Sequence, residues 1–199
     1  KEIYRWDAIS PQTQVFGVIG YPVAHSMSPL IHNAGFTHIN FDGIYLPMPI
    51  SPEYEHFKAT IGAWLDMADL HFTGASVTIP HKENLLRFVR ERGGQIDPLA
   101  ERIGAANTLT RHNDGRLEAV NTDCAAATEA VCNGMGIGHD GLKNQRVSVV
   151  GAGGVARAVV AGFAHYGATV VIYNRTFERA KALADHFQNM AGKVVAARL

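Results

Sequence analysis

Residues 146–156 read RVSVVGAGGVA, and this stretch decides the fold of the second half of the chain. An apolar run at 146–150 is followed by a glycine-rich turn and then by residues 155–166 with helical periodicity. The turn fits G-x-G-x-x-[G/A], which leaves room for a pyrophosphate against free N–H groups at the helix start. The stretch predicts a strand–turn–helix that binds a dinucleotide, with these cofactor-binding residues: Gly151, Ala152, Gly153, Gly154 and Val155.

Strand and helix patterns alternate beyond this turn. A strand is expected at 168–173, a helix at 176–188 and the beginning of a third strand at 193–197. This alternation is typical of a parallel sheet with crossover helices, as in a Rossmann-like domain. A free-standing domain of about 60 residues would be short of core. We therefore expect residues 142–199 to be an incomplete, C-terminally truncated nucleotide-binding domain.

The residues after the second of these strands bear on which cofactor is bound. NAD-selective domains place Asp or Glu about 20 residues beyond the glycines, to hold the ribose hydroxyls. This chain has Asn174, Arg175 and Thr176 there, followed by Arg179. A guanidinium suits a 2′-phosphate, so the pattern favours NADP. The alternative is that both arginines are solvated charges at a helix start.

The first half of the chain also alternates. Strands are expected at 15–20, 43–48 and 75–79, helices at 29–36, 53–65 and 83–91, and a hairpin around 113–116, with Ser28 placed to cap the first helix. The fold class is α/β: a substrate-binding α/β domain followed by the truncated Rossmann-like domain. The predicted organisation is a junction at 1–14, a catalytic domain at 15–123, a connecting helix and hinge at 124–141, and the NADP-binding domain at 142–199.

Polar clusters follow the predicted strands of the first domain. They read HSMSP at 25–29, SVTIPHKE at 76–83, GAANT at 104–108 and NTD at 121–123. Ligands of open α/β sheets bind beyond the carboxyl ends of the strands. Serine, threonine, lysine, asparagine and aspartate at those ends are the groups needed to hold a small polyhydroxy acid.

These motifs, with GYPVAHSMSPLIHN at 20–33, GAGGVARA at 151–158 and NRTFERA at 174–180, resemble the shikimate dehydrogenase family in order and spacing. The resemblance implies a two-domain enzyme that reduces 3-dehydroshikimate to shikimate with NADPH. It also implies that Ser26 and Ser28 bind the substrate carboxylate, and that Thr78, Asn107 and Asp123 bind its hydroxyls. Lys82 would be the catalytic acid/base and would also bind the substrate, with Asp123 beside it as the second catalytic residue.

The chemistry of ketone reduction agrees with this assignment. Hydride addition leaves an alkoxide, which needs a proton donor within hydrogen-bond reach, and a lysine can serve. Asp123 would orient Lys82 and a substrate hydroxyl. Cys124, which departs from the residues common after the NTD motif, is expected to pack. Family elements that contact substrate and nicotinamide from beyond residue 199 are absent, so the piece alone is expected to turn over poorly.

The segment Tyr4-Arg5-Trp6-Asp7 resembles the junction of fused proteins in which a type I 3-dehydroquinate dehydratase precedes the dehydrogenase. The rival functions are a quinate/shikimate dehydrogenase that accepts either cofactor and a non-catalytic metabolite sensor of the same fold. Retention of both Lys82 and Asp123 argues against the sensor, because binding alone needs no proton relay.

Composition excludes several other classes. The 199 residues carry 18 basic and 18 acidic side chains, a balance that argues against nucleic acid. No apolar run approaches the ~20 residues of a membrane span. Two cysteines cannot form a disulfide framework, which favours a reducing, cytoplasmic setting. The ten histidines form no H-E-x-x-H motif, so no metal site is expected.

Overall fold

The computed structural model describes residues 2–199, so residue 1 of the predicted junction lies outside the described residues. The chain forms two compact units, Lys1–Val120 and Asn121–Leu199. The predicted connecting segment 124–141 lies entirely within the second unit, because its helix packs on a helix of that unit.

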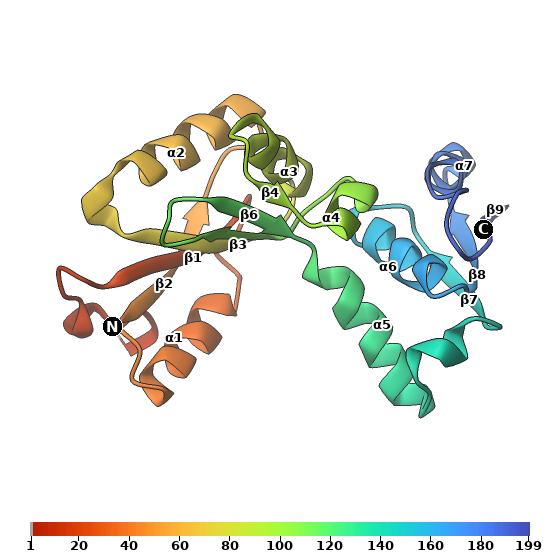
Figure 1. The fold of residues 1–199 in the computed structure, drawn as a ribbon, viewed down its shortest axis with the longest axis horizontal. Helices are drawn as coiled ribbons and strands as arrows, with labels where there is room; N and C mark the ends of the chain where they lie inside the picture. The colour runs from red at the N-terminus through yellow and green to blue at the C-terminus, as the bar shows by residue number, and fades with distance from the viewer. Residues whose placement is uncertain (1) are drawn as a thin grey trace. The chain divides into compact units, whose positions relative to one another are not determined.

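The first unit is built on a six-stranded mixed sheet (Figure 1) with the order β2-β1-β3-β5-β6-β4. β1 pairs in parallel with β2 and β3, whereas β5 is antiparallel to both of its neighbours. The predicted hairpin is the β5–β6 pair. The strands are β1 (Gln14–Gly20), β2 (Gly43–Pro49), β3 (Phe72–Val77), β4 (Gln95–Ile96), β5 (Thr108–Arg111) and β6 (Leu117–Val120).

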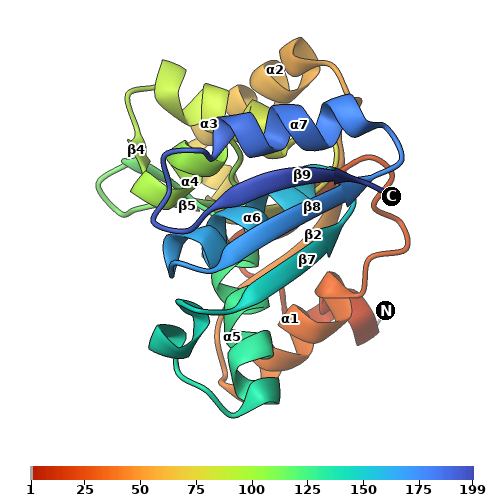
Figure 2. The same ribbon diagram turned by 90° about the vertical axis from the view of Figure 1, so that its right-hand side faces the viewer.

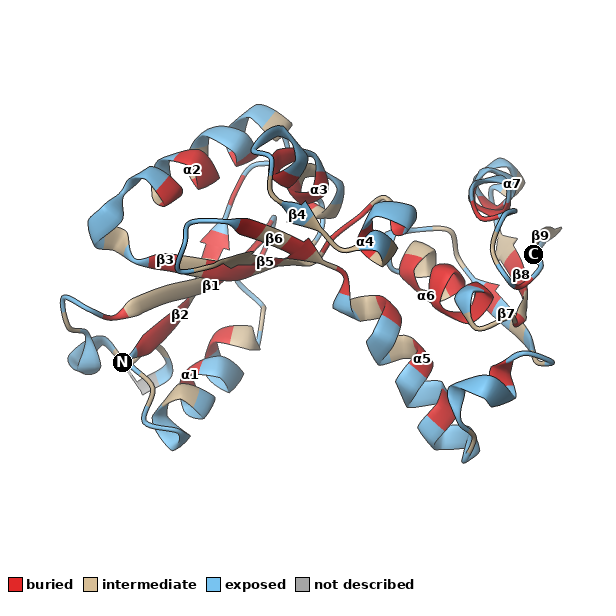
Figure 3. Ribbon diagram, viewed as in Figure 1, coloured by how far each residue is buried: buried red, intermediate tan, exposed pale blue. Residues whose placement is uncertain are grey.

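Helices cover both faces of this sheet (Figure 1) because its strands alternate apolar side chains between two cores. The larger core contains Ile19 of β1 and Phe57 of α2, both fully buried, and α3 packs into it as well. The smaller core lies against α1, where Phe36 packs with Phe16. The helices are α1 (Ser28–His38), α2 (Tyr54–Asp66), α3 (Lys82–Glu91) and α4 (Pro98–Ile103), with 3-10 turns at Glu2–Tyr4, Trp6–Ala8 and Ala68–Leu70. Figure 3 shows buried residues on the inner sides of α2 and α3.

The N-terminal segment is docked on this unit. The Arg5 guanidinium donates to the backbone oxygens of Phe41 and Gly43 at 3.0 and 2.6 Å. The Asn33 side-chain amide of α1 donates to the Ile3 oxygen at 2.8 Å. Ile3 and Arg5 of the predicted junction are therefore hydrogen-bonded to residues of α1, β2 and the segment before β2.

The second unit contains a parallel three-stranded sheet with the order β7-β8-β9 (Figure 2). α6 packs on β7 and β8, α7 packs on β8 and β9, and α5 packs on α6. The fold is the expected strand–turn–helix alternation of a Rossmann-like domain. Its elements are α5 (Thr122–Met135), a 3-10 turn at His139–Leu142, β7 (Arg146–Val150), α6 (Gly154–His165), β8 (Thr169–Asn174), α7 (Phe177–His186) and β9 (Val194–Arg198).

Close packing between α5 and α6 requires a glycine. A Cβ on Gly162 would lie 2.7 Å from Thr128 Cγ2 and 2.8 Å from Cys124 Sγ, and both of those side chains are buried. We expect Gly162→Ala to lower the free energy of unfolding by about 1–3 kcal/mol, the usual cost of overpacking.

Chemical denaturation of the 199-residue chain measures this effect, with Gly134→Ala as the matched control. Gly134 lies in α5, and a Cβ added to it would meet no atom within 4 Å. An alanine there should change stability by less than about 1 kcal/mol, in the stabilising direction. Equal effects of the two substitutions would contradict the close approach of the two helices.

Two local predictions differ from the structure. Ser28 is the first residue of α1 rather than its cap: the cap position is Met27, and the Ser26 hydroxyl accepts a 3.3 Å bond from the Ser28 N–H. The second difference is that β4 and α4 were not expected. β4 has only two residues and no alternation, but Asp97 followed by Pro98 is a helix-start signal, and the Asp97 carboxylate accepts from Leu99 and Ala100 N–H.

Candidate active site

Three loops of the first unit meet at the edge of the sheet where β1 and β3 end. The parallel pairing of β1 and β3 places Gly20 and Val77 at the same edge. The loop after β1 leads to Ser26 and Ser28, and the segment after β3 leads to Thr78 and Lys82. Both serines, Thr78 and Lys82 are half-buried, so they are sheltered and remain accessible.

Asn107 joins the same edge from the antiparallel strand. Its backbone oxygen accepts a 2.7 Å bond from Val77 N–H, and its N–H donates to Val120 at 3.0 Å. The Thr108 hydroxyl donates to the Asn107 side-chain oxygen at 3.1 Å. The structure thus brings five of the predicted residues to one sheet edge: Ser26, Ser28, Thr78, Lys82 and Asn107.

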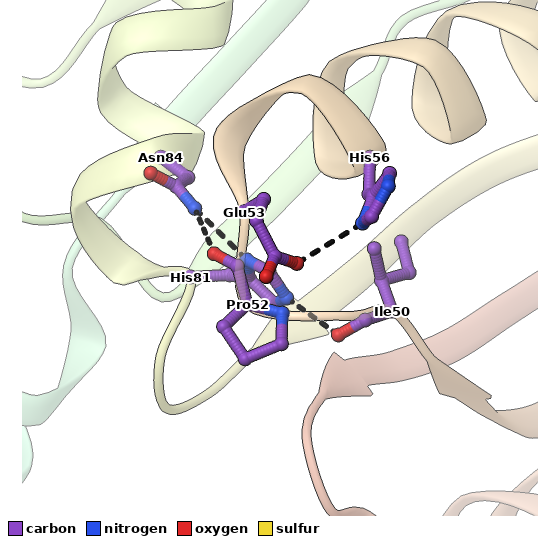
Figure 4. A network of polar contacts seen from close by, with 6 residues as sticks. All are labelled: Ile50, Pro52, Glu53, His56, His81 and Asn84. Atoms are coloured by element: carbon purple, nitrogen blue, oxygen red, sulfur yellow. Dashed lines mark hydrogen bonds and ion pairs between the residues drawn. The ribbon is translucent and has the colours of Figure 1, made fainter.

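The start of α3 is held by a buried histidine next to Lys82. His81 is fully buried, and its Nε2 lies 2.8 Å from the Ile50 oxygen while Asn84 Nδ2 lies 3.0 Å from its Nδ1 (Figure 4). The carbonyl must accept and the amide must donate, which assigns the neutral imidazole with its proton on Nε2. The Phe57 ring lies 5.0 Å from the imidazole. His81 therefore packs in the core directly beside Lys82.

Lys82 begins α3 directly after this histidine. Its backbone oxygen accepts a 3.0 Å bond from the Ala106 N–H, which ties the helix start to the segment that carries Asn107. Lys82 is therefore fixed by its own backbone oxygen and by the residue before it, whose ring makes two hydrogen bonds. The Glu53 carboxyl, drawn in Figure 4, has its pKa lowered by its own backbone N–H and further by His56.

Asp123 lies in the second unit, in the first turn of α5. The Asn121 side chain caps this helix by accepting from the N–H groups of Asp123 and Cys124 at 3.1 and 3.4 Å. A carboxylate in the first turn of a helix is stabilised by the helix dipole. Cys124 is buried and packs toward α6, as expected.

The glycine turn of the second unit has the shape that a phosphate needs. Gly151 has a φ of 110°, and a Cβ at Gly151, Gly153 or Gly154 would meet no atom within 4 Å. Gly153 is the cap residue of α6, and among the described residues no side chain caps that helix. The first N–H groups of α6 are therefore available to a phosphate.

The predicted 2′-phosphate residues lie beside this turn. Gly151 N–H donates to Tyr173 at 2.7 Å, so the loops after β7 and β8 are neighbours. Asn174 bonds the backbone oxygen of Thr176 at 2.7 Å, which shapes the second loop. Arg175 and Arg179 are exposed, and within residues 2–199 neither side chain makes an ion pair or hydrogen bond. Both guanidinium groups are available to an anion.

Ser76 was not recognised from the sequence. It lies two residues before Thr78 on β3 and is half-buried. Alternation along the strand would have found it, because residues two apart point to the same face.

Two surface hollows of about 270 and 630 Å³ lie at the other edge of the sheet, beside Arg111 and Gly115, and contain none of the candidate residues.

The described residues contain no group of three or more His, Cys, Asp or Glu side chains placed to hold a metal ion. No helix among them is both long and apolar enough to cross a membrane.

Two family models match the chain, one for each unit. Residues 18–109 match the shikimate dehydrogenase substrate binding domain, and residues 137–197 match shikimate / quinate 5-dehydrogenase. The chain is 39% identical over 194 residues to the chloroplastic bifunctional 3-dehydroquinate dehydratase/shikimate dehydrogenase of Arabidopsis thaliana, covering 92% of this chain and 30% of that protein. It is 41% identical over 177 residues to the shikimate dehydrogenase (NADP(+)) of Paramagnetospirillum magneticum, covering 88% and 60%.

A solved structure agrees with these matches. Shikimate 5-dehydrogenase from Thermus thermophilus, in complex with NADP(H) and shikimate, superimposes with a TM-score of 0.73 and 33% identity, over 92% of this chain and 63% of that one. The chain thus spans less than two thirds of these relatives. The fold and the two loop systems define a two-unit α/β protein of the dehydrogenase type. The chain belongs to the shikimate dehydrogenase family.

Proposed function

We propose that this chain is the substrate-binding domain and the first part of the cofactor domain of an NADP-dependent shikimate dehydrogenase. The observation that carries the proposal is the meeting of Ser26, Ser28, Thr78, Lys82 and Asn107 at one sheet edge, within the unit that matches the substrate-binding family model. In this proposal residues 15–123 bind shikimate, residues 142–199 bind NADP, and residues 124–141 connect them.

The substrate assignment follows from the chemistry of these groups. The hydroxyls of Ser26 and Ser28 suit a carboxylate. Thr78, Asn107 and Asp123 suit the ring hydroxyls. The relatives named above for shikimate and NADP support the same assignment.

NADPH supplies hydride to the ketone carbon of 3-dehydroshikimate when bound. The chain's own part is to hold the ketone and to protonate the alkoxide oxygen from the Lys82 ammonium, which becomes neutral lysine. In this proposal Asp123, in the first turn of α5, is the second catalytic residue and binds a substrate hydroxyl. The turn 151–155 would hold the pyrophosphate, and Asn174, Arg175, Thr176 and Arg179 would surround the 2′-phosphate.

The proposal also covers a neighbouring domain and the cellular compartment. The match to the Arabidopsis protein supports a fused 3-dehydroquinate dehydratase preceding this chain. Cys124 and Cys132 are both free thiols, which suits a reducing compartment, and we propose the cytoplasm.

Shikimate-dependent reduction of NADP⁺, followed by absorbance, tests the proposal. The 199-residue chain is compared with the longest natural chain that contains it. We expect activity in the longer protein and little in the shorter one. Faster turnover with quinate or with NAD⁺ would favour the quinate/shikimate rival. Absence of turnover in both, with shikimate binding retained, would favour the metabolite sensor.

A further inference from the structure

Tyr45 of β2 is attached to α1 through both its backbone and its ring. Its N–H donates to the Asn33 side-chain oxygen at 2.8 Å, and the Asn33 amide donates back to the Tyr45 oxygen at 2.8 Å. The His32 imidazole stacks on the phenol ring, with centroids 4.2 Å apart and planes at 10°. Tyr45 is only 3% exposed, so His32 covers it from solvent. Two successive residues of α1 therefore hold a single residue of the sheet.

The side chain of Tyr45 points across the sheet toward β3. Tyr45 pairs with Phe16, and Val18 pairs with Ser76, so these side chains share the face that α1 covers. Burial raises the pKa of Tyr45 and hydrogen bonding toward Ser76 opposes that rise, which agrees with the shared face, although the contact falls short of standard hydrogen-bond geometry. Thr78 follows Ser76 on the same face. One residue thus reaches from α1 to the strand that leads into the site.

The Tyr45 hydroxyl is buried and makes no hydrogen bond of standard geometry among the described residues. A buried polar group left unpaired is unfavourable, and its retention calls for a reason. Within residues 2–199, the Tyr54 hydroxyl is the only other buried side-chain polar atom without a hydrogen bond. Tyr54 lies on α2, on the other face of the sheet, where the Arg87 guanidinium sits 3.7 Å from its ring centroid.

We propose that Tyr45 is a positioning residue that fixes the start of α1, with Ser26 and Ser28, against the end of β3, with Thr78. This inference rests on the proposed function, in which those residues hold opposite sides of the substrate. With shikimate bound between these groups, the Tyr45 hydroxyl donates to Ser76 in standard hydrogen-bond geometry. The spacing between the carboxylate-binding and hydroxyl-binding groups is then set by one rigid side chain.

Calorimetric titration of the 199-residue chain with shikimate tests the role of the hydroxyl. Tyr45→Phe removes only that oxygen, and Tyr54→Phe removes the other such oxygen, which lies on the opposite face of the sheet beside Arg87. We expect Tyr45→Phe to raise the Kd for shikimate about five-fold, the value of one hydrogen bond. Tyr54→Phe should leave the Kd unchanged. Equal Kd values for the two variants would overturn the proposal, since a purely structural hydroxyl affects stability and not ligand affinity.

A second experiment tests the attachment of α1 without any ligand. His32→Ala removes the stacked ring, whereas His32→Phe keeps an aromatic face against Tyr45. We expect amide hydrogen exchange at residues 31–35, whose N–H groups are bonded within α1, to be several-fold faster in His32→Ala and to return to the wild-type rate in His32→Phe. Unchanged exchange in His32→Ala would overturn the proposed attachment of α1 to Tyr45. Failure of the wild-type chain to bind shikimate would instead overturn the proposed function. The exchange result would still show whether His32 holds α1 against Tyr45.

Discussion

Replacing Lys82 by alanine is expected to slow shikimate oxidation by about 10²–10⁴-fold, the usual contribution of a positioned acid or base. Lys82 is half-buried at the first position of α3, fixed by the Ala106 bond and by the buried His81 before it. The substrate carboxylate is assigned to Ser26 and Ser28 instead, so shikimate affinity should change by only a few-fold. Initial rates in the longest natural chain and calorimetric binding measure the two quantities separately.

The control for this substitution is Lys58→Ala. Lys58 lies on α2 and pairs with Glu91 at 2.8 Å on the exposed surface of the same unit. Its removal deletes the same side chain and should leave rate and affinity unchanged. If Lys82→Ala lost binding and rate to the same extent, Lys82 would be a binding residue and the proton-transfer role would be wrong.

Replacing Arg175 by alanine is expected to raise the KM for NADP⁺ by about 10–100-fold, as for the loss of a hydrogen bond between charged groups. The KM for NAD⁺ should stay the same, because NAD⁺ has no phosphate at the 2′ position. The Arg175 guanidinium is exposed beside the glycine turn and has no partner within the described residues, so the substitution removes no structural contact. Initial rates with each cofactor measure the preference.

Arg146→Ala serves as the control, because Arg146 is an exposed arginine at the opposite end of β7. That variant should keep the wild-type preference for NADP⁺. An unchanged preference in Arg175→Ala would remove Arg175 from the 2′-phosphate site. Arg179 would then be the remaining arginine to examine.

The second unit could be predicted nearly residue by residue because each of its boundaries carries a local signal. The glycine turn ends β7, Gly167 with its φ of 82° ends α6, and the apolar runs between them are long. The sheet of the first unit was harder to predict. The β5–β6 hairpin has a local turn signal, but the antiparallel pairing of β5 with β3 is non-local, and β4 pairs with β6 over only two residues. No local pattern encodes such pairings.

In the candidate site, too, features with a local sequence signal could be predicted and features set by pairing across strands could not. Loops that begin at strand ends could be recognised from their polar residues, and the structure brings five of those residues together at one edge. The relation between Tyr45 and Ser76 could not be predicted, because it runs across β1 from β2 to β3. From the sequence alone, a tyrosine inside an apolar strand is predicted only to pack in the core.

The docking of the first residues has a practical consequence for domain dissection. A recombinant fragment that started at β1 would lose the Arg5 guanidinium that binds the oxygens of Phe41 and Gly43, and Asn33 would lose its bond to Ile3. The minimal autonomous fragment therefore begins ahead of the first strand. Limited proteolysis should accordingly spare residues 3–8, and a cloning boundary placed at the start of the sheet would cut through the folded part of the protein.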